Sequence, residues 1–177
     1  STESILKSLL PAVLAALSLN GVNLQVDFRD TKFSGGTDPL LQWIKRSEGI
    51  VAAYYGEFPT SSLRIQVVPQ DGAGVRGGQT WAGFIRIQVG REVTPAQLMD
   101  DWVLVHEMTH LALPDMGESQ SWFSEGLAVY VEGIARVQAG NRSQEDVFSE
   151  QMRQMPRGMP QAGDRGLDHT HTWARTY

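Results

Sequence analysis

Cysteine is absent from this 177-residue sequence, which excludes disulfide bonds and zinc sites built from thiolates. A metal ion bound by the chain would therefore need histidine, aspartate or glutamate side chains. Histidine is itself scarce, with four residues in the whole chain, so a motif made of histidines is improbable by chance. The lack of cysteine leaves the compartment open, because cytosolic and exported proteins can both do without it.

An excess of positive charge is also missing, since the formal net charge is −5. A mildly acidic chain has no electrostatic attraction to nucleic acid or to an anionic membrane surface, so we exclude nucleic acid as a partner. The length suits one domain, and 41% hydrophobic residues provide the material for a core. The sequence carries no information on the oligomeric state.

Long hydrophobic runs are missing too, and the longest, residues 9–17, is too short to span a bilayer. Apolar residues at helical spacing over 5–17 predict an amphipathic helix that ends at Asn20-Gly21. The alternative is the apolar part of a signal peptide, preceded by Lys7, which would indicate export. The chain begins without methionine, from which we expect that it was processed or cut from something longer.

Apolar periodicity divides the rest of the chain into strands and helices. Alternation predicts strands over 22–28, 63–68 and 84–89, and helical spacing predicts helices over 38–55, 95–113 and 122–139. We expect the strand at 84–89 to form an edge of the sheet, and the glycine-rich stretch 72–83 to form a flap above a cleft. Strands and helices in this order predict an α+β domain.

One motif carries chemistry: His106-Glu107-Met108-Thr109-His110. Four residues along a helix bring two side chains to the same face, so both imidazoles could bind one zinc ion. Glu107 would lie close enough to take a proton from a zinc-bound water. Asp100 and Asp101 could accept a hydrogen bond from an imidazole, although acidic residues near a helix start are common for dipole reasons.

A third ligand for such a site is Glu125, which lies inside the apolar run Trp122-Phe123-Ser124-Glu125-Gly126-Leu127-Ala128-Val129-Tyr130. A carboxylate among so many apolar residues is costly unless it is paired or bound to a metal. The prediction is therefore one zinc ion per chain, held by His106, His110 and Glu125.

These two segments resemble the gluzincin zinc metallopeptidases, in which H-E-x-x-H is followed by a helix reading W-[FL]-x-E-G-x-A-x-Y. The most similar groups are peptidase-MA-like domains and the catalytic domains of leucyl- and glycyl-type aminopeptidases. The resemblance is specific over residues 102–132, where Glu125 matches the third zinc ligand. Over 38–89 it extends only to the order of elements, and it does not reach 1–20 or 140–177. It implies a zincin-like fold with a small mixed sheet and a helical C-terminal part.

The departures from these aminopeptidases concern substrate binding. Their G-A-M-E-N segment, whose glutamate holds the free amine of the substrate, corresponds here to residues 77–83, which include no acidic residue. The loop between His110 and Glu125 is slightly shorter. Their transition-state tyrosine belongs to a segment Y-x-x-G-A, of which Tyr177 could be the first residue. Tyr177, His169 and His171 are therefore candidates for stabilising an oxyanion, and a terminal or solvated position is the alternative for each.

The sequence thus predicts a zinc metallopeptidase that acts on a peptide or protein, with Glu107 as general base and Tyr177 as a further catalytic residue. We expect one domain over 1–177, with a helix-and-strand half at 1–93 and a metal-binding half at 94–177. Two alternatives stay open: a zinc-bearing binding or regulatory module without turnover, and a zinc amidohydrolase acting on a non-protein amide. Endopeptidase and aminopeptidase action are both compatible with these residues.

Overall fold

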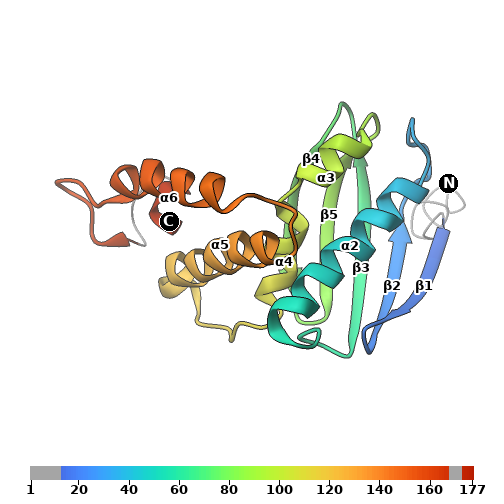
Figure 1. Cartoon of the computed structure of the whole chain (residues 1–177), viewed down its shortest axis with the longest axis horizontal. Helices are drawn as coiled ribbons and strands as arrows, with labels where there is room; N and C mark the ends of the chain where they lie inside the picture. Colours follow the sequence, from blue (N-terminus) through green and yellow to red (C-terminus); the bar gives the residue numbers. More distant parts are fainter. Residues whose placement is uncertain (1–12, 168–172) are drawn as a thin grey trace, which may run out of the picture.

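A computed structural model of the chain describes residues 13–167 and 173–177 and shows a five-stranded mixed sheet with helices beside it (Figure 1). The elements in chain order are β1 (Val13–Leu19), β2 (Val22–Phe28), α2 (Asp38–Tyr55), β3 (Ser62–Gln70), β4 (Val75–Trp81), β5 (Phe84–Gly90), α3 (Pro95–Asp100), α4 (Val103–His110), the 3₁₀ turn η1 (Glu118–Gln120), α5 (Ser121–Gln138), α6 (Gln144–Gly158) and the 3₁₀ turn η3 (Trp173–Thr176).

The strand order is β1-β2-β3-β5-β4, which makes β4 the edge strand on one side of the sheet. The three central strands β2, β3 and β5 run parallel, and β1 and β4 pair antiparallel at the two sides. The prediction that residues 84–89 form an edge was wrong, because β5 lies between β3 and β4. The glycine-rich stretch supplies β4, so it is largely a strand where we expected a loop.

The N-terminal helix predicted over 5–17 is also wrong for the part that the structure describes, because β1 begins at Val13. Residues 5–12 lie outside the described residues. Asn20 and Gly21, expected to end a helix, form the two-residue turn between β1 and β2, with φ angles of 45° and 80°. Positive φ at both residues is what a tight hairpin turn requires, and Asn-Gly is its preferred sequence.

The core lies between the sheet and two helices that cover one of its faces. Inward residues of β2, β3 and β5, such as Ile65 and Ile87, contact the apolar side of α2, where Leu40 and Ile44 are fully buried. Leu104 and Met108 of α4 join the same core. Because α4 buries Leu104 and Met108 against the sheet, the helix cannot rotate. Glu107, on another side of α4, is therefore held at a fixed position next to β4.

The helix predicted over 95–113 is interrupted at Asp101 and Trp102, which separate α3 from α4. The Asp101 carboxylate accepts hydrogen bonds from the backbone N–H groups of Val103 and Leu104 and from the indole of Trp43. Burial raises the pKa of Asp101, although these bonds lower it. Asp101 therefore fixes the residue at which α4 begins, and its bond with Trp43 connects this point to α2.

The C-terminal part is helical, as expected, and extends beyond the β4 side of the sheet (Figure 1). Helix α5 packs against α4 and α2, and α6 and η3 pack against α5. Helix α6 was not recognised in the sequence, since its apolar positions are few and Pro156 lies inside it. None of the described helices is long and apolar enough to cross a membrane.

Candidate metal centre

Helix α4 places the two motif histidines one turn apart on the side that faces α5. Their Nε2 atoms lie 3.2 Å from each other, and both rings are largely shielded from solvent. Spacing of four residues explains this arrangement, because the helix returns nearly to the same face after 3.6 residues.

Helix α5 supplies the third group of the centre, Glu125, from its first turns. Its Oε2 lies 2.8 Å from Nε2 of His106, and its Oε1 lies 3.3 Å from Nε2 of His110. The side chain reaches this point because α5 packs directly against α4. Among the described residues, His106, His110 and Glu125 form a group whose ligand atoms all lie within 4.8 Å of one another.

The spacing of these three atoms fits a tetrahedral zinc ion. Zinc–ligand distances of about 2.0–2.1 Å with tetrahedral angles separate neighbouring ligand atoms by roughly 3.3 Å. The observed separations of 3.2, 2.8 and 3.3 Å are close to that value. Two imidazoles and one carboxylate are also a donor set that zinc accepts, with one position left for water.

The charge of the centre is set by contact among the same three groups. Burial alone would raise the pKa of Glu125, but its hydrogen bonds with His106 and His110 lower it to about 2. Burial lowers the pKa of His110, but the neighbouring Glu125 raises it overall. Glu125 is therefore a carboxylate at neutral pH, as a metal ligand must be.

Aromatic rings from two parts of the chain enclose His106. The ring of Trp102 meets the imidazole at a centroid distance of 5.4 Å, and that of Trp173 at 5.9 Å. Within the described residues, Nδ1 of His106 is buried without a hydrogen-bond partner, so neither Asp100 nor Asp101 binds it there. We had no sequence signal for Trp173, which lies 67 positions after His106 in a segment without a recognisable motif.

Glu107 lies beside the centre and contacts the edge strand β4. The hydroxyl of Thr80 donates to Oε2 of Glu107 at 2.5 Å and lies 3.0 Å from its backbone oxygen. Gly78 leaves room for this side chain, because a Cβ there would lie 2.7 Å from Cγ of Glu107. Thr80 lies in the segment that corresponds to G-A-M-E-N, where no local sequence pattern marks it as part of the site.

Tyr177 directly follows η3, and its hydroxyl donates to Oε1 of Glu150 at 3.0 Å. Burial and the neighbouring Glu150 raise the pKa of Tyr177 to about 12. The structure thus brings His106, His110 and Glu125 together and pairs Tyr177 with α6. The other two oxyanion candidates, His169 and His171, lie outside the described residues.

Comparisons with known proteins give a likeness in structure alone. No protein-family model matches the sequence, and no curated protein matches it. The M1 zinc metallopeptidase from Deinococcus radiodurans superposes with a TM-score of 0.55 at 15% identity, and a mutant of that enzyme gives the same values. The alignment covers 95% of this chain and 37% of the other one, so the chain spans little more than a third of that enzyme's length.

The fold and the candidate site together show which class of protein this chain is similar to. The chain has a mixed α/β fold similar to that of M1 zinc metallopeptidases, and three residues in it could hold a metal ion. At this level of identity the likeness concerns the fold alone, and any activity depends on the residues of the centre.

Proposed function

We propose that the chain is a zinc-dependent metallopeptidase in which His106, His110 and Glu125 hold the metal and Glu107 is the general base. The observation that carries the proposal is the convergence of two imidazole nitrogens and a carboxylate from α4 and α5, with Glu107 beside them. When bound there, zinc supplies Lewis-acid activation of a water molecule and of the scissile carbonyl.

Glu107 is the residue that moves the proton. Its Oε2 is occupied by Thr80, and in the described part of the chain Oε1 has no hydrogen-bond partner. We infer that Oε1 accepts a proton from the attacking water and later delivers it to the leaving amine. Thr80 holds the carboxylate in one orientation, so that Oε1 is the oxygen that accepts the proton from the water.

The edge strand β4 is the natural partner for an extended substrate. It runs beside α4, and among the described residues no further strand pairs with its outer side, so a peptide could bind there as an additional strand. This replaces our expectation that residues 84–89 would serve as that edge. Binding through backbone groups holds a peptide along its length and requires no free end.

An oxyanion donor completes the proposal, and Tyr177 is the candidate retained from the sequence. Its hydroxyl is bound to Glu150 in this structure, so donation to a substrate requires that this hydrogen bond be exchanged for one to the substrate. Zinc and a phenol together would stabilise the charge that develops on the carbonyl oxygen.

The test separates metal binding from turnover. Glu107→Gln should keep one zinc per chain and lose cleavage of a mixed peptide library by several orders of magnitude, because the base is removed and the ligands remain. His106→Ala should lose both. Zinc content by elemental analysis and cleavage by mass spectrometry provide the two readouts. A folded wild-type protein that binds zinc and cleaves no peptide would favour a regulatory module or an amidohydrolase.

A further inference from the structure

A cavity of about 260 Å³ lies beside the metal centre, between α5, α6, η3 and the start of α4. Its walls include the rings of Trp102 and Trp173, and its inner end includes Glu132 and Arg136 of α5. Both charged residues are nearly inaccessible to solvent, with 4% and 2% of their surface exposed. Pockets that enclose whole small ligands measure about 300–1,000 Å³, so this cavity has the size for one side chain.

The cavity adjoins the metal centre through shared residues and shared helices. Trp102 and Trp173, which line it, also contact the ring of His106. On α5, Glu132 follows Glu125 by seven residues, which places it on nearly the same face about 10.5 Å further along the helix. The metal ligands themselves do not line the cavity, so a substrate side chain that enters it from the metal would pass the rings of Trp102 and Trp173.

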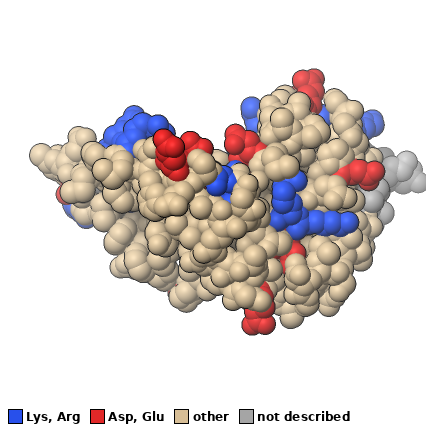
Figure 2. Space-filling model, in the orientation of Figure 1, with Lys and Arg blue, Asp and Glu red and all other residues tan. Residues whose placement is uncertain are grey.

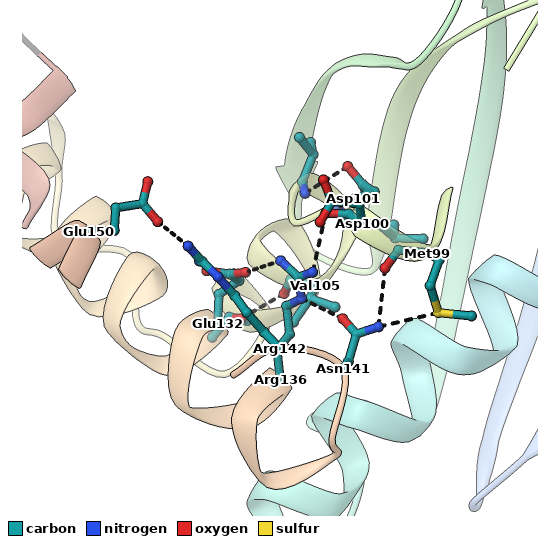
Figure 3. Close-up of polar contacts among 12 residues, drawn as sticks. Met99, Asp100, Asp101, Val105, Glu132, Arg136, Asn141, Arg142 and Glu150 are labelled. Carbon is teal, nitrogen blue, oxygen red and sulfur yellow. Dashed lines mark hydrogen bonds and ion pairs between the residues drawn. The ribbon is translucent and has the colours of Figure 1, made fainter. Parts of the chain in front are cut away.

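The charges around the cavity leave one acceptor at its inner end. Arg136 uses all three nitrogens, donating to Glu132 Oε1, to the side chain of Asn141 and to the backbone oxygen of Asp100 (Figure 3). The second oxygen of Glu132 has no partner among the described residues. Burial raises the pKa of Glu132 even though Arg136 and, less strongly, Arg142 and His106 lower it, so its neighbours only partly offset the cost of burying this carboxylate.

The other charged groups that line the cavity are paired or lie at its rim. Arg142 donates to Glu150, which also accepts from Tyr177, and these contacts hold the pKa of Glu150 below its usual value against the effect of burial (Figure 3). Asp100 is exposed at the rim. Two arginines against three carboxylates leave the lining with an excess of one negative charge.

We propose that this cavity binds the long basic side chain of a lysine or arginine next to the scissile bond, with Glu132 accepting from its charged end. The two tryptophan rings would contact the aliphatic part and attract the cation through their faces. This inference rests on the proposed function, and it names the class of substrate. The alternative ligand for Glu132, the α-amine of a substrate, is too short to reach an acceptor that lies two helical turns from Glu125.

The experiment uses zinc-loaded protein and a set of peptides that differ at one position at a time. Lysine, arginine, norleucine and glutamate are placed in turn at each position flanking the cleaved bond. One flanking position should show roughly 10- to 100-fold higher kcat/KM for lysine or arginine than for norleucine, the size expected for a hydrogen bond to a charged group. Glutamate should be the poorest substrate at that position.

Variants at Gln151 test whether the preference arises in this cavity. Gln151 lines it from α6 and is partly exposed, so a charge there is compatible with folding. Gln151→Lys should reduce the ratio of lysine to norleucine cleavage at least fivefold, and Gln151→Glu should raise it. Ser149→Lys adds the same charge to an exposed position of α6 outside the lining and should leave the ratio unchanged. Glu132→Gln should abolish the preference in protein whose zinc content is unchanged.

The outcomes distinguish this inference from the function beneath it. Cleavage with no preference for basic side chains, or a preference that both Gln151 variants leave unchanged, overturns the inference and leaves the peptidase intact. Opposite shifts by Gln151→Lys and Gln151→Glu support it. If zinc-loaded protein cleaves no peptide at all, the proposed function fails and this inference fails with it.

Discussion

At the scale of single residues, the contact between Thr80 and Glu107 is the most informative feature of the site. A short hydrogen bond from Thr80 holds one oxygen of the carboxylate, and Gly78 admits the side chain against β4. A donor to a carboxylate favours its charged form and fixes its direction. We infer that Thr80 positions the proposed general base, so its loss should lower kcat more than it changes KM.

We therefore predict that Thr80→Val, which keeps the shape and removes the hydroxyl, lowers kcat by about 10- to 100-fold. KM should change much less than kcat, because the hydroxyl orients the base and does not hold the substrate. Thr80→Ser should restore most of the activity, and both variants should bind zinc like wild type. A loss of activity that is the same in Thr80→Ser as in Thr80→Val would show that the contact is only structural.

Prediction from sequence reached some residues of the site more readily than others. The histidines and Glu107 lie within five consecutive positions on one helix, so their proximity follows from helix geometry alone. Glu125 was recognisable because a carboxylate in an apolar run needs a partner. Thr80 and Trp173 come from distant segments, and their contacts depend on strand pairing and on packing that no local pattern encodes.

At the scale of elements, the start of α4 depends on a single carboxylate. Asp101 accepts hydrogen bonds from two backbone N–H groups and from the indole of Trp43, and so it joins α4, which carries both motif histidines, to α2. Asp101→Ala should lower the free energy of unfolding by about 1–3 kcal/mol, because three donors lose their acceptor in a largely buried place. Thermal or urea unfolding measures this.

Asp100→Ala is the matched control, since the neighbouring carboxylate is exposed and should contribute within about 0.5 kcal/mol. Equal stability of the two variants would contradict the role given to Asp101. Zinc affinity should also fall in Asp101→Ala, because a frayed first turn of α4 loosens His106.

Some helices and strands were predicted wrongly because the same sequence pattern is compatible with two kinds of secondary structure. Apolar residues over 13–19 fit a helical stripe as well as a strand, and the Asn-Gly pair fits a helix end as well as a hairpin turn. Pairing with β2 decides between them, because each residue of β1 from Val13 to Leu19 has a partner in β2. The edge position of β4 was hidden for another reason, since its glycines have low strand propensity.

At the scale of the whole molecule, the proposed metal centre connects two groups of elements. His106 and His110 belong to α4, which packs on the sheet, whereas Glu125 belongs to α5, which carries α6 and η3. On the face shown in Figure 2, acidic and basic side chains are dispersed among uncharged ones. Bound zinc should therefore join the two parts.

Zinc should raise the melting temperature of the protein, because a ligand that binds the folded state alone stabilises it by RT ln(1 + [L]/Kd). At a free zinc concentration 100 times Kd the gain is about 2.7 kcal/mol. Calorimetry with and without a chelator measures the shift. In His110→Ala the shift should be largely lost, and an equal shift in that variant would place the zinc elsewhere.

The manner in which the molecule as a whole holds a substrate distinguishes endopeptidase from aminopeptidase action. An aminopeptidase needs a carboxylate near the metal to hold the free ammonium group, since an unpaired charge in a partly desolvated pocket is costly. Residues 72–91 contain none, and Thr80 is occupied by Glu107. Binding along β4 depends on backbone groups that every peptide has.

We therefore expect an acetylated peptide and its free-amine twin to be cleaved with similar kcat/KM, at internal bonds. Mass spectrometry of the products measures both. Stepwise release of single residues from the free-amine peptide, with the acetylated one resistant, would show that an amine anchor exists and that the substrate enters by its end.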